Sequence, residues 1–132
     1  DAQVEGDVNG GTYGVLCHMQ DRDNYHYVEI DLSDYTYRFG VYQNDEDTAL
    51  LEEGWGDASY LNTNRNAVNR IMVSCDPDLI SLFINNQLER QVSLDPFANA
   101  GTMALFASTW DGLGDSGYKV IFDNLYAFKP VQ

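Results

Sequence analysis

Hydrophobic residues in this chain alternate with polar ones in short runs, and turn-forming residues separate one run from the next. This period of two is typical of β-strands with one buried face, and no segment keeps the 3.6-residue period of an amphipathic helix. Many short strands without helices predict an all-β fold, either a sandwich or a barrel. The expected strands are residues 3–5, 12–19, 25–31, 35–42, 49–55, 67–75, 79–84, 87–94, 102–108 and 118–128.

Turn chemistry supports these boundaries. The stretches 9–11, 21–24, 44–47 and 111–117 are rich in asparagine, aspartate and glycine, the residues that turns prefer. The pair Asn85-Asn86 lies between "LISLFI" and "QLERQV". Because asparagine tolerates positive φ, this pair predicts a two-residue hairpin turn.

Length and charge limit the function classes. A chain of 132 residues, 44% of them hydrophobic, fits one globular domain over residues 1–132. No run approaches the roughly 20 apolar residues of a membrane span, and "DAQVEGD" at the start does not resemble a signal peptide. We therefore expect a mature form, a fragment or a cytosolic protein. The formal charge of −14 repels a phosphate backbone and argues against nucleic acid as a partner.

Two cysteines are present, Cys17 and Cys75, and neither belongs to a zinc-binding pattern. Both end apolar alternating runs, "YGVLC" and "IMVSC". If both faces point into one core, a disulfide between neighbouring strands is expected, and it would place the protein outside the cytosol. Two free buried thiols are the alternative.

The order of these motifs along the chain resembles a known superfamily. The segments "YGVLCHMQDRDNYHYVEI", "YRFGVY", "NRIMVSCDPDLISLFINNQLERQV", "GTMALFAST" and "VIFDNLYAF" are similar to the concanavalin A-like lectin/glucanase superfamily. The likeness is nearest to the laminin-G-like and 3-keto-disaccharide-hydrolase-like domains of bacterial surface and secreted proteins. It implies an antiparallel jelly-roll β-sandwich, in a superfamily that includes lectins, hydrolases and adhesion modules.

The chain departs from that pattern at its start. In such domains, several dozen residues that form early strands of both sheets precede the segment resembling "DAQVEGD". The resemblance therefore implies either a shortened variant or a strand supplied by another piece of the precursor or by a neighbouring subunit. An uncovered sheet edge favours such pairing.

Residues 25–42 are expected to form a hairpin around Ser33-Asp34. In this register Ile30, Val28 and His26 share an apolar face with Tyr37, Phe39 and Val41, while the other face is polar. On the polar face Glu29 lies opposite Arg38, Tyr27 lies over Gly40, and Tyr25 lies opposite Tyr42. The pairs expected across the strands are 31 with 36, 30 with 37, 29 with 38, 28 with 39, 27 with 40, 26 with 41 and 25 with 42.

The acidic stretch "EIDLSD" resembles the carboxylate cluster of jelly-roll glucanases. That pattern places its outer glutamates four or five residues apart, but here the fourth position after Glu29 is Ser33 and the fifth is Asp34, in the expected turn. We also expect Arg38 to lower the pKa of Glu29, the wrong direction for a general acid. The stretch is therefore interpreted as a structural strand with an ion pair, and a glucanase-type hydrolase is the lesser alternative.

The polar face suggests a sugar platform, because tyrosine rings stack on the apolar faces of pyranoses and carboxylates accept hydroxyl hydrogen bonds. The alternative is that these tyrosines merely cover a sheet. Tryptophans in loops are further candidates, since loops often carry binding residues, although either ring could instead fold back over the sandwich. The candidate carbohydrate-binding residues are Tyr25, Tyr27, Glu29, Arg38, Tyr42, Trp55 and Trp110.

Calcium is the only cofactor that the sequence suggests. Asp21, Asp23 and Asn24 lack EF-hand spacing and are interpreted as a hairpin turn. Asp123 lies inside the apolar run "VIFDNLYAF", and resemblance to jelly-roll glucanases makes it a candidate ligand of structural calcium. The alternative is that Asp123 and Asn124 satisfy backbone groups at a bulge.

These observations together favour a secreted or cell-surface module that binds a glycan or a cell-surface polysaccharide without catalysis of its own. The first rival is a structural subunit that assembles through an open sheet edge, by self-association or by taking a strand from another chain. His18 and His26 are not spaced for a metal and are expected to be ordinary strand residues.

Overall fold

The computed structural model describes residues 1–6, 10–64, 66–97, 99–109 and 118–127, and in these residues it contains strands and no α-helix. Accordingly, the described residues include no helix that is long and apolar enough to span a membrane. The strands are β1 (Ala2–Gly6), β2 (Gly11–Asp21), β3 (Asn24–Asp31), β4 (Thr36–Gln43), β5 (Glu46–Ala49), β6 (Gly56–Asp57), β7 (Val68–Asn69), β8 (Ile71–Asp76), β9 (Leu79–Ile84), β10 (Gln87–Ser93), β11 (Thr102–Thr109) and β12 (Tyr118–Phe122).

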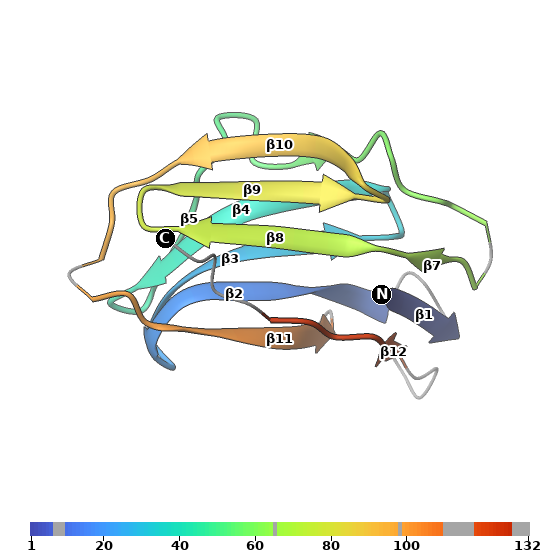
Figure 1. The fold of residues 1–132 in the computed structure, drawn as a ribbon, viewed down its shortest axis with the longest axis horizontal. Helices are drawn as coiled ribbons and strands as arrows, with labels where there is room; N and C mark the ends of the chain where they lie inside the picture. Colours follow the sequence, from blue (N-terminus) through green and yellow to red (C-terminus); the bar gives the residue numbers. More distant parts are fainter. Residues whose placement is uncertain (7–9, 65, 98, 110–117, 128–132) are drawn as a thin grey trace.

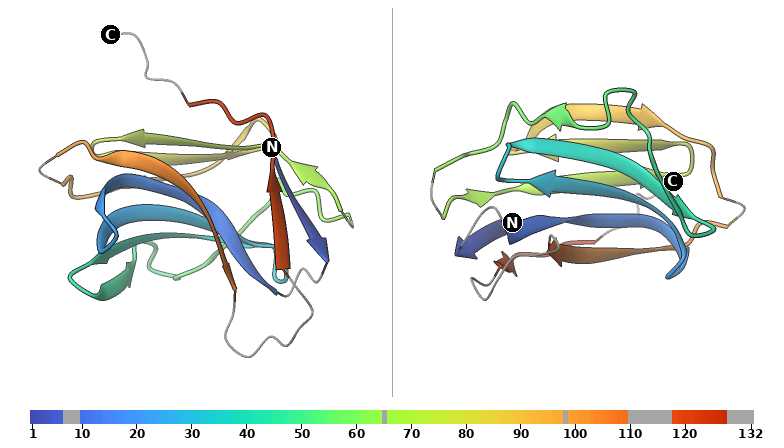
Figure 2. Two further views of the ribbon diagram at one scale, coloured as in Figure 1. Left: turned by 90° about the horizontal axis from the view of Figure 1, so that it is seen from below. Right: turned by 180° about the vertical axis from the view of Figure 1, so that it is seen from behind.

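The strands form two layers that face each other (Figures 1 and 2). One layer is the large sheet, with the strand order β11-β2-β3-β4-β5 and β6 beside β4. The other layer contains two three-stranded sheets, β10-β9-β8 and β12-β1-β7. Only Arg70 separates β7 of one sheet from β8 of the other, so the chain passes directly from one sheet to the next. All strand pairs are antiparallel, which confirms the expected all-β antiparallel sandwich.

The core lies between the layers and consists of the apolar residues that alternate along the strands. Val28 and Ile30 of β3 face Ile80 and Leu82 of β9 across it, and each of the four is at most 1% exposed. β3 supplies every second residue to the core, as the sequence predicts for a strand with one buried face. The fully buried side chains are Tyr13, Phe39, Ile30, Ile80, Leu82, Ile84, Val28, Asn69, Thr12 and Cys17.

The predicted Asn85-Asn86 turn and the predicted hairpin register are confirmed, whereas the predicted turn at 111–117 lies outside the described residues. Asn85 and Asn86 both have positive φ, 51° and 67°, and they connect β9 to β10. This is the left-handed backbone that a two-residue hairpin turn requires. In the β3–β4 hairpin, all seven expected pairs from 31 with 36 to 25 with 42 are present. The connection itself spans residues 32–35, so the turn is broader than Ser33-Asp34 alone.

Some strand boundaries differ from the expectation. The predicted strand 49–55 is wrong, because β5 covers Glu46–Ala49 and the chain then bends until β6. The cause is the Asn44-Asp45 turn, whose residues have φ values of 55° and 61° and start the return strand at once. β12 also ends at Phe122, before the acidic Asp123 and before Asn124, whose φ is 51°.

Cys17 and Cys75 form a disulfide, with 5.6 Å between their Cα atoms. Cys17 lies in β2 of the large sheet and Cys75 lies in β8 of the other layer. The sequence predicted a bond between neighbouring strands. The bond instead joins opposite layers across the core.

The disulfide closes a long loop, and its removal should destabilise the fold. For a sequence separation of 58 residues, the chain-entropy relation gives a loss of about 4 kcal/mol. We expect the double variant Cys17→Ala/Cys75→Ala to lose roughly this free energy of unfolding, measured by urea denaturation. A loss below about 1 kcal/mol would contradict the view that this bond constrains the unfolded chain.

His18 and His26 lie in contact beside the disulfide, which their spacing in the sequence did not indicate. Their Nδ1 atoms are 3.2 Å apart, and Nε2 of His18 lies 3.2 Å from the carbonyl oxygen of Cys75. Because a carbonyl only accepts, His18 carries its proton on Nε2, and Nδ1 of His26 donates to Nδ1 of His18. His26 is 2% exposed and stacks on Phe97 at a centroid distance of 4.3 Å.

This histidine pair predicts a loss of stability in acid. Burial, aided by the nearby His18, lowers the pKa of His26 to about 4 from its ordinary 6.5. Because the unfolded chain then binds a proton at higher pH than the folded chain, stability should fall as the pH drops from about 6.5 to about 4. The loss attributable to His26 is at most about 3 kcal/mol.

Urea denaturation at pH 7, 5.5 and 4 of the native protein and of His26→Gln tests this prediction. The difference between the two proteins in the free energy of unfolding at each pH cancels the contribution of the carboxylates that titrate in the same range. A difference that does not change with pH would contradict the assignment.

Candidate functional site

The outer face of the large sheet gathers aromatic and charged side chains from three neighbouring strands. Tyr25, Tyr27 and Glu29 alternate along β3, and the confirmed register places them opposite Tyr42, Gly40 and Arg38 of β4. Asp47 of β5 lies opposite Tyr42. Residues directly opposite each other in antiparallel strands share a face. We call the set Tyr25, Tyr27, Glu29, Arg38, Tyr42 and Asp47 the tyrosine face.

Two of its tyrosines form a stacked pair. The rings of Tyr25 and Tyr42 have centroids 5.4 Å apart and an interplanar angle of 20°. Tyr25 also meets Tyr27 edge-on, with centroids 6.2 Å apart. Both Tyr25 and Tyr42 are half-buried, so part of the pair is open to solvent.

Tyr27 lies flat over Gly40, as the sequence predicts. A Cβ atom added to Gly40 would come within 2.2 Å of Cζ of the Tyr27 ring, so the ring occupies the space that any other residue would need. The guanidinium carbon of Arg38 lies 5.5 Å from the centre of the same ring, within the range of a cation–π contact. The glycine therefore lets an aromatic ring pack against the sheet backbone.

A chain of polar contacts ties the tyrosine face together. The Tyr27 hydroxyl donates to Oδ1 of Asp47 over 2.6 Å. Arg38 bridges two carboxylates, with Nη1 3.0 Å from Oδ2 of Asp47 and 3.5 Å from Oε1 of Glu29. Thr12 of β2 donates from Oγ1 to Oε2 of Glu29 over 2.9 Å. Each charged group of the face thus has a partner of opposite charge or a hydroxyl donor.

These contacts lie at different depths. The side chains of Glu29 and Arg38 are 11% and 18% exposed, whereas that of Asp47 is 45% exposed. Tyr27 is 6% exposed. A ligand approaching from solvent would therefore meet Asp47 and the Tyr25–Tyr42 pair first, with Arg38 and Glu29 beneath them.

The pKa of Glu29 moves in the direction opposite to the sequence expectation. Burial raises the pKa of Glu29, and the Thr12 hydroxyl and the Arg38 guanidinium oppose this effect without overcoming it. Arg38 does act to lower the pKa of Glu29, as expected, but the expected net direction was wrong because burial outweighs it: Glu29 is only 9% exposed. Desolvation of a carboxylate favours its neutral form.

The raised pKa alone does not make Glu29 a general acid. Oε2 accepts the hydrogen bond from Thr12, and Oε1 is paired with Arg38. Asp31, on the same face, accepts hydrogen bonds at Oδ1 from the backbone nitrogen and the hydroxyl of Ser33. The carboxylates nearest in sequence are thus engaged in holding the strands and the turn.

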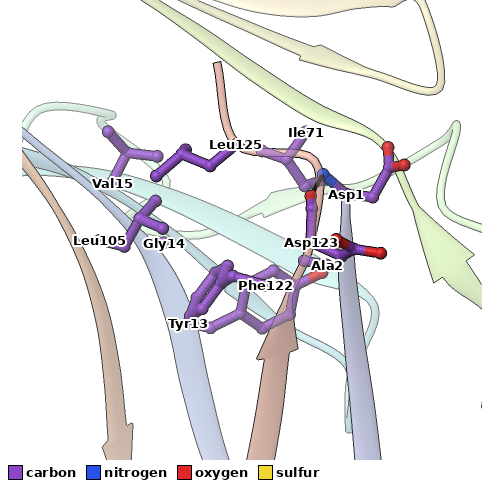
Figure 3. Close-up of a pocket in the computed structure, with 10 residues that line it drawn as sticks. All are labelled: Asp1, Ala2, Tyr13, Gly14, Val15, Ile71, Leu105, Phe122, Asp123 and Leu125. Atoms are coloured by element: carbon purple, nitrogen blue, oxygen red, sulfur yellow. Dashed lines mark hydrogen bonds between the residues drawn. The ribbon is translucent and has the colours of Figure 1, made fainter. Parts of the chain in front are cut away.

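A hollow lies away from the tyrosine face, between the two layers (Figure 3). Val15, Leu105, Ile71 and Phe122 supply its apolar walls, and Leu125 reaches over it. The full lining is Asp1, Ala2, Tyr13, Gly14, Val15, Ile71, Leu105, Phe122, Asp123 and Leu125. None of the tyrosine-face residues lines this hollow.

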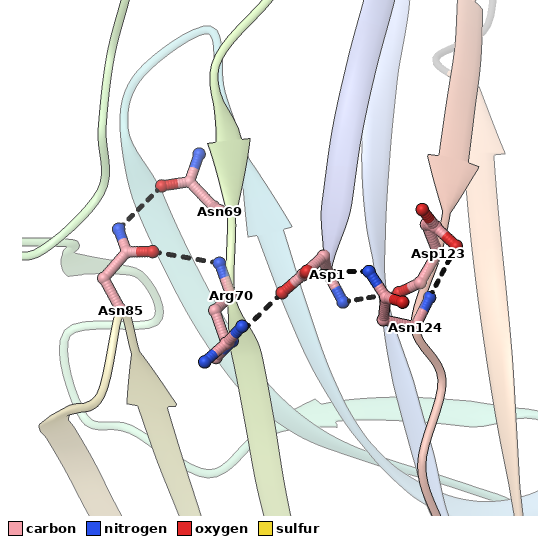
Figure 4. A network of polar contacts seen from close by, with 6 residues as sticks. All are labelled: Asp1, Asn69, Arg70, Asn85, Asp123 and Asn124. Carbon is pink, nitrogen blue, oxygen red and sulfur yellow. Dashed lines mark hydrogen bonds and ion pairs between the residues drawn. The ribbon is translucent and has the colours of Figure 1, made fainter.

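Asp123 takes part in a network of polar contacts (Figure 4). Its Oδ1 accepts a hydrogen bond of 2.8 Å from the backbone nitrogen of Asn124, and its carbonyl oxygen lies 2.8 Å from the backbone nitrogen of Asp1. Arg70 donates to Oδ1 of Asp1 over 3.1 Å. In the described residues, no group of three or more His, Cys, Asp or Glu side chains is arranged to hold a metal. Calcium binding by Asp123 stays a prediction.

The two tryptophans are not brought together with the tyrosine face. Trp55 is half-buried in the segment between β5 and β6, and its role in binding stays a prediction. Trp110 lies outside the described residues.

Sequence reasoning missed two members of the network, Asp47 and Thr12. Asp47 was placed in a turn, although Asn44-Asp45 is a two-residue turn signal that would have set Asp47 opposite Tyr42. Thr12 pairs with Asp31 across β2 and β3. The pairing could not be predicted by counting back from the Asp21–Asn24 turn, because the register of β2 against β3 shifts between Cys17 and Asp21.

Comparison with known proteins gives one informative result. No protein-family profile and no curated protein sequence matches the chain. Among solved structures, the fold is similar to the carbohydrate binding module CBM66 from Bacillus subtilis, with a TM-score of 0.57 and 10% sequence identity. The match covers 80% of this chain and 62% of that one, so the chain spans less than two thirds of the neighbour's length. At this identity the likeness supports the β-sandwich fold.

The geometry predicts that the Tyr27 hydroxyl stabilises the fold. Tyr27→Phe should lower the free energy of unfolding by about 1–3 kcal/mol, because a largely buried hydrogen bond to a carboxylate is lost. Tyr42→Phe is the matched control, since in the described part of the chain its hydroxyl forms no side-chain hydrogen bond, and it should change stability by less than about 0.5 kcal/mol. Equal effects in urea denaturation would contradict the proposed role of the Tyr27–Asp47 contact.

Proposed function

We propose that this chain is a non-catalytic carbohydrate-binding module and that its tyrosine face binds the glycan. The observation that carries the proposal is the half-buried, stacked Tyr25–Tyr42 pair beside the exposed carboxylate of Asp47. Aromatic rings offer an apolar surface for the C–H faces of a sugar, and a carboxylate accepts hydrogen bonds from its hydroxyls. The fold likeness to a carbohydrate-binding module is consistent with this function.

The site is held in place before any ligand arrives. Tyr27 is fixed by Gly40 beneath it and by the hydrogen bond to Asp47, and Asp47 is also held by Arg38. Binding to side chains that are already ordered costs less conformational entropy than binding to mobile ones. A rigid platform therefore suits recognition of a weakly binding ligand such as a sugar.

The charge of the face narrows the class of glycan. Arg38 is already paired with both Glu29 and Asp47, and the whole chain carries a formal charge of −14. A uronic acid or a sulfated sugar would be repelled and would have to compete for Arg38. The face thus fits a neutral, hydroxyl-rich glycan.

An extracellular location forms part of the proposal. The disulfide between Cys17 and Cys75 would persist in an oxidising compartment and would be reduced in most cytosols. Glycans of cell surfaces and matrices are found in such compartments.

Binding to an array of neutral and anionic glycans, followed by titration calorimetry on any hit, tests the proposal. We expect neutral glycans to bind, and Tyr25→Ala or Tyr42→Ala to weaken binding by roughly five- to thirtyfold, equivalent to about 1–2 kcal/mol. Tyr60→Ala is the control, because Tyr60 is 45% exposed and lies in the connection between β6 and β7. Unchanged affinity of the Tyr42 variant, or exclusive binding of anionic glycans, would refute the assignment of this face.

A further inference from the structure

The outer strands of the sheets differ in how they are protected against pairing with another chain. Native proteins protect edge strands by keeping them short, by placing charges or proline on them, by introducing bulges, or by covering them. β5 is four residues long and carries Glu46 and Asp47. β10 carries Glu89 and Arg90 and has a register shift between Leu88 and Arg90. These two edges are therefore protected.

The edges of the second layer that lie nearest to β11 are also protected. β12 is five residues long and carries Lys119. β8 is six residues long and ends with the charged Asp76.

β11 has few of these protections. It is eight residues long, with the sequence "TMALFAST", and contains no charged residue and no proline. Its pairing with β2 is regular from Ala104 to Thr109, and the one register shift lies at its start. Within the described part of the chain, β2 is its sole partner. Such an edge presents a row of backbone donors and acceptors to an added strand.

The hollow lies beside this edge. Leu105 of β11 is opposite Val15 of β2, on the inner face of the large sheet, and both line the hollow. Side chains of a strand alternate between the two faces of its sheet. A strand added to β11 would therefore point every second side chain toward the space between the layers, where Leu105, Val15 and Ile71 provide apolar walls. The covering Leu125 is 66% exposed and has much apolar surface left to bury.

The net charge of the protein favours one kind of strand as the partner of β11. A second copy of this chain brings a further formal charge of −14, and repulsion between two such molecules opposes pairing. Asp1 and Asp123 line the hollow beside the apolar residues, and Asp1 is paired with Arg70. An approaching strand with basic residues is attracted by the same field that repels a second copy.

We propose that the outer edge of β11 is a docking site for an extended, basic segment of a partner protein, which adds as a strand and places apolar side chains over the hollow. This surface is separate from the tyrosine face, so the proposal does not depend on carbohydrate binding.

Fluorescence anisotropy with labelled synthetic peptides tests the proposal. The probe is a nine-residue peptide of alternating threonine and valine with a lysine at each end. Its matched control carries glutamate in place of both lysines. We expect the basic peptide to bind at least tenfold more tightly than the acidic one at 20 mM salt, and this ratio to shrink at 0.5 M salt because the charges are screened. Hydrogen exchange should slow at the amides of β11.

Variants locate the docking site. Ala107 is exposed and lies on the inner face of β11, opposite Tyr13, so Ala107→Lys places an inward-pointing charge on this edge and should weaken peptide binding at least tenfold. Ser108→Lys, on the opposite face of the same strand, provides a second test if Ala107→Lys unfolds. Gln87→Lys adds the same charge to the exposed start of β10 and should leave binding unchanged.

Several outcomes would overturn the proposal. Equal binding of the basic and acidic peptides would remove the role of charge. Binding that survives both lysine variants of β11, or an absence of peptide binding, would remove the role of this edge. Sedimentation of the native protein as a dimer that Ala107→Lys dissociates would show a second copy, rather than a basic partner, on β11.

Discussion

The register between β3 and β4 is the constraint on which both the core and the tyrosine face depend. In this register Val28 with Phe39 and Ile30 with Tyr37 point into the core, and the same pairing sets Glu29 against Arg38 on the outer face. A slip of one residue would turn every side chain of one strand to the other face. Arg38 would then oppose Val28 or Ile30, so burial of the core and pairing of the charges enforce the same alignment.

The polar face of this hairpin depends on every buried polar group having a partner, rather than on any single contact. Glu29 is desolvated enough for its pKa to rise, yet Thr12 and Arg38 satisfy both of its oxygens. A buried ion pair costs desolvation free energy that only good geometry and additional hydrogen bonds can offset. Asp47 completes the arrangement by accepting from both Arg38 and Tyr27. Tyr27, Glu29 and Arg38 of the tyrosine face are consequently each held by a hydrogen bond or an ion pair.

Local patterns predicted the parts of the structure that depend on neighbouring strands. Alternation and turn chemistry predicted an all-β sandwich or barrel, the β3–β4 register and the Asn85-Asn86 turn, because each follows from residues close together in the chain. The choice of an antiparallel sandwich came from the resemblance to a known superfamily. The two cysteines were expected to bond, but the alternation of their runs shows only that each faces a core. It does not show that the core lies between two sheets. The pKa of Glu29 and the contact of His18 with His26 depend on burial, and burial is set by the packing of the layers. The register shift near the end of β2 also prevented a prediction of which β3 residue lies opposite Thr12.

The distribution of charge along the edges connects these features to the surroundings of the molecule. A chain with 21 acidic and 7 basic residues has ample charge to protect every strand that ends a sheet, and β5 and β10 carry such charges. β11 carries none, although charged side chains, lysine especially, are a common protection of edge strands. The strand also borders the hollow between the layers, where an apolar side chain from outside would meet Leu105 and Val15. An uncharged edge beside an unfilled apolar space, on an otherwise strongly acidic protein, is the arrangement that admits a basic strand while it keeps identical molecules apart.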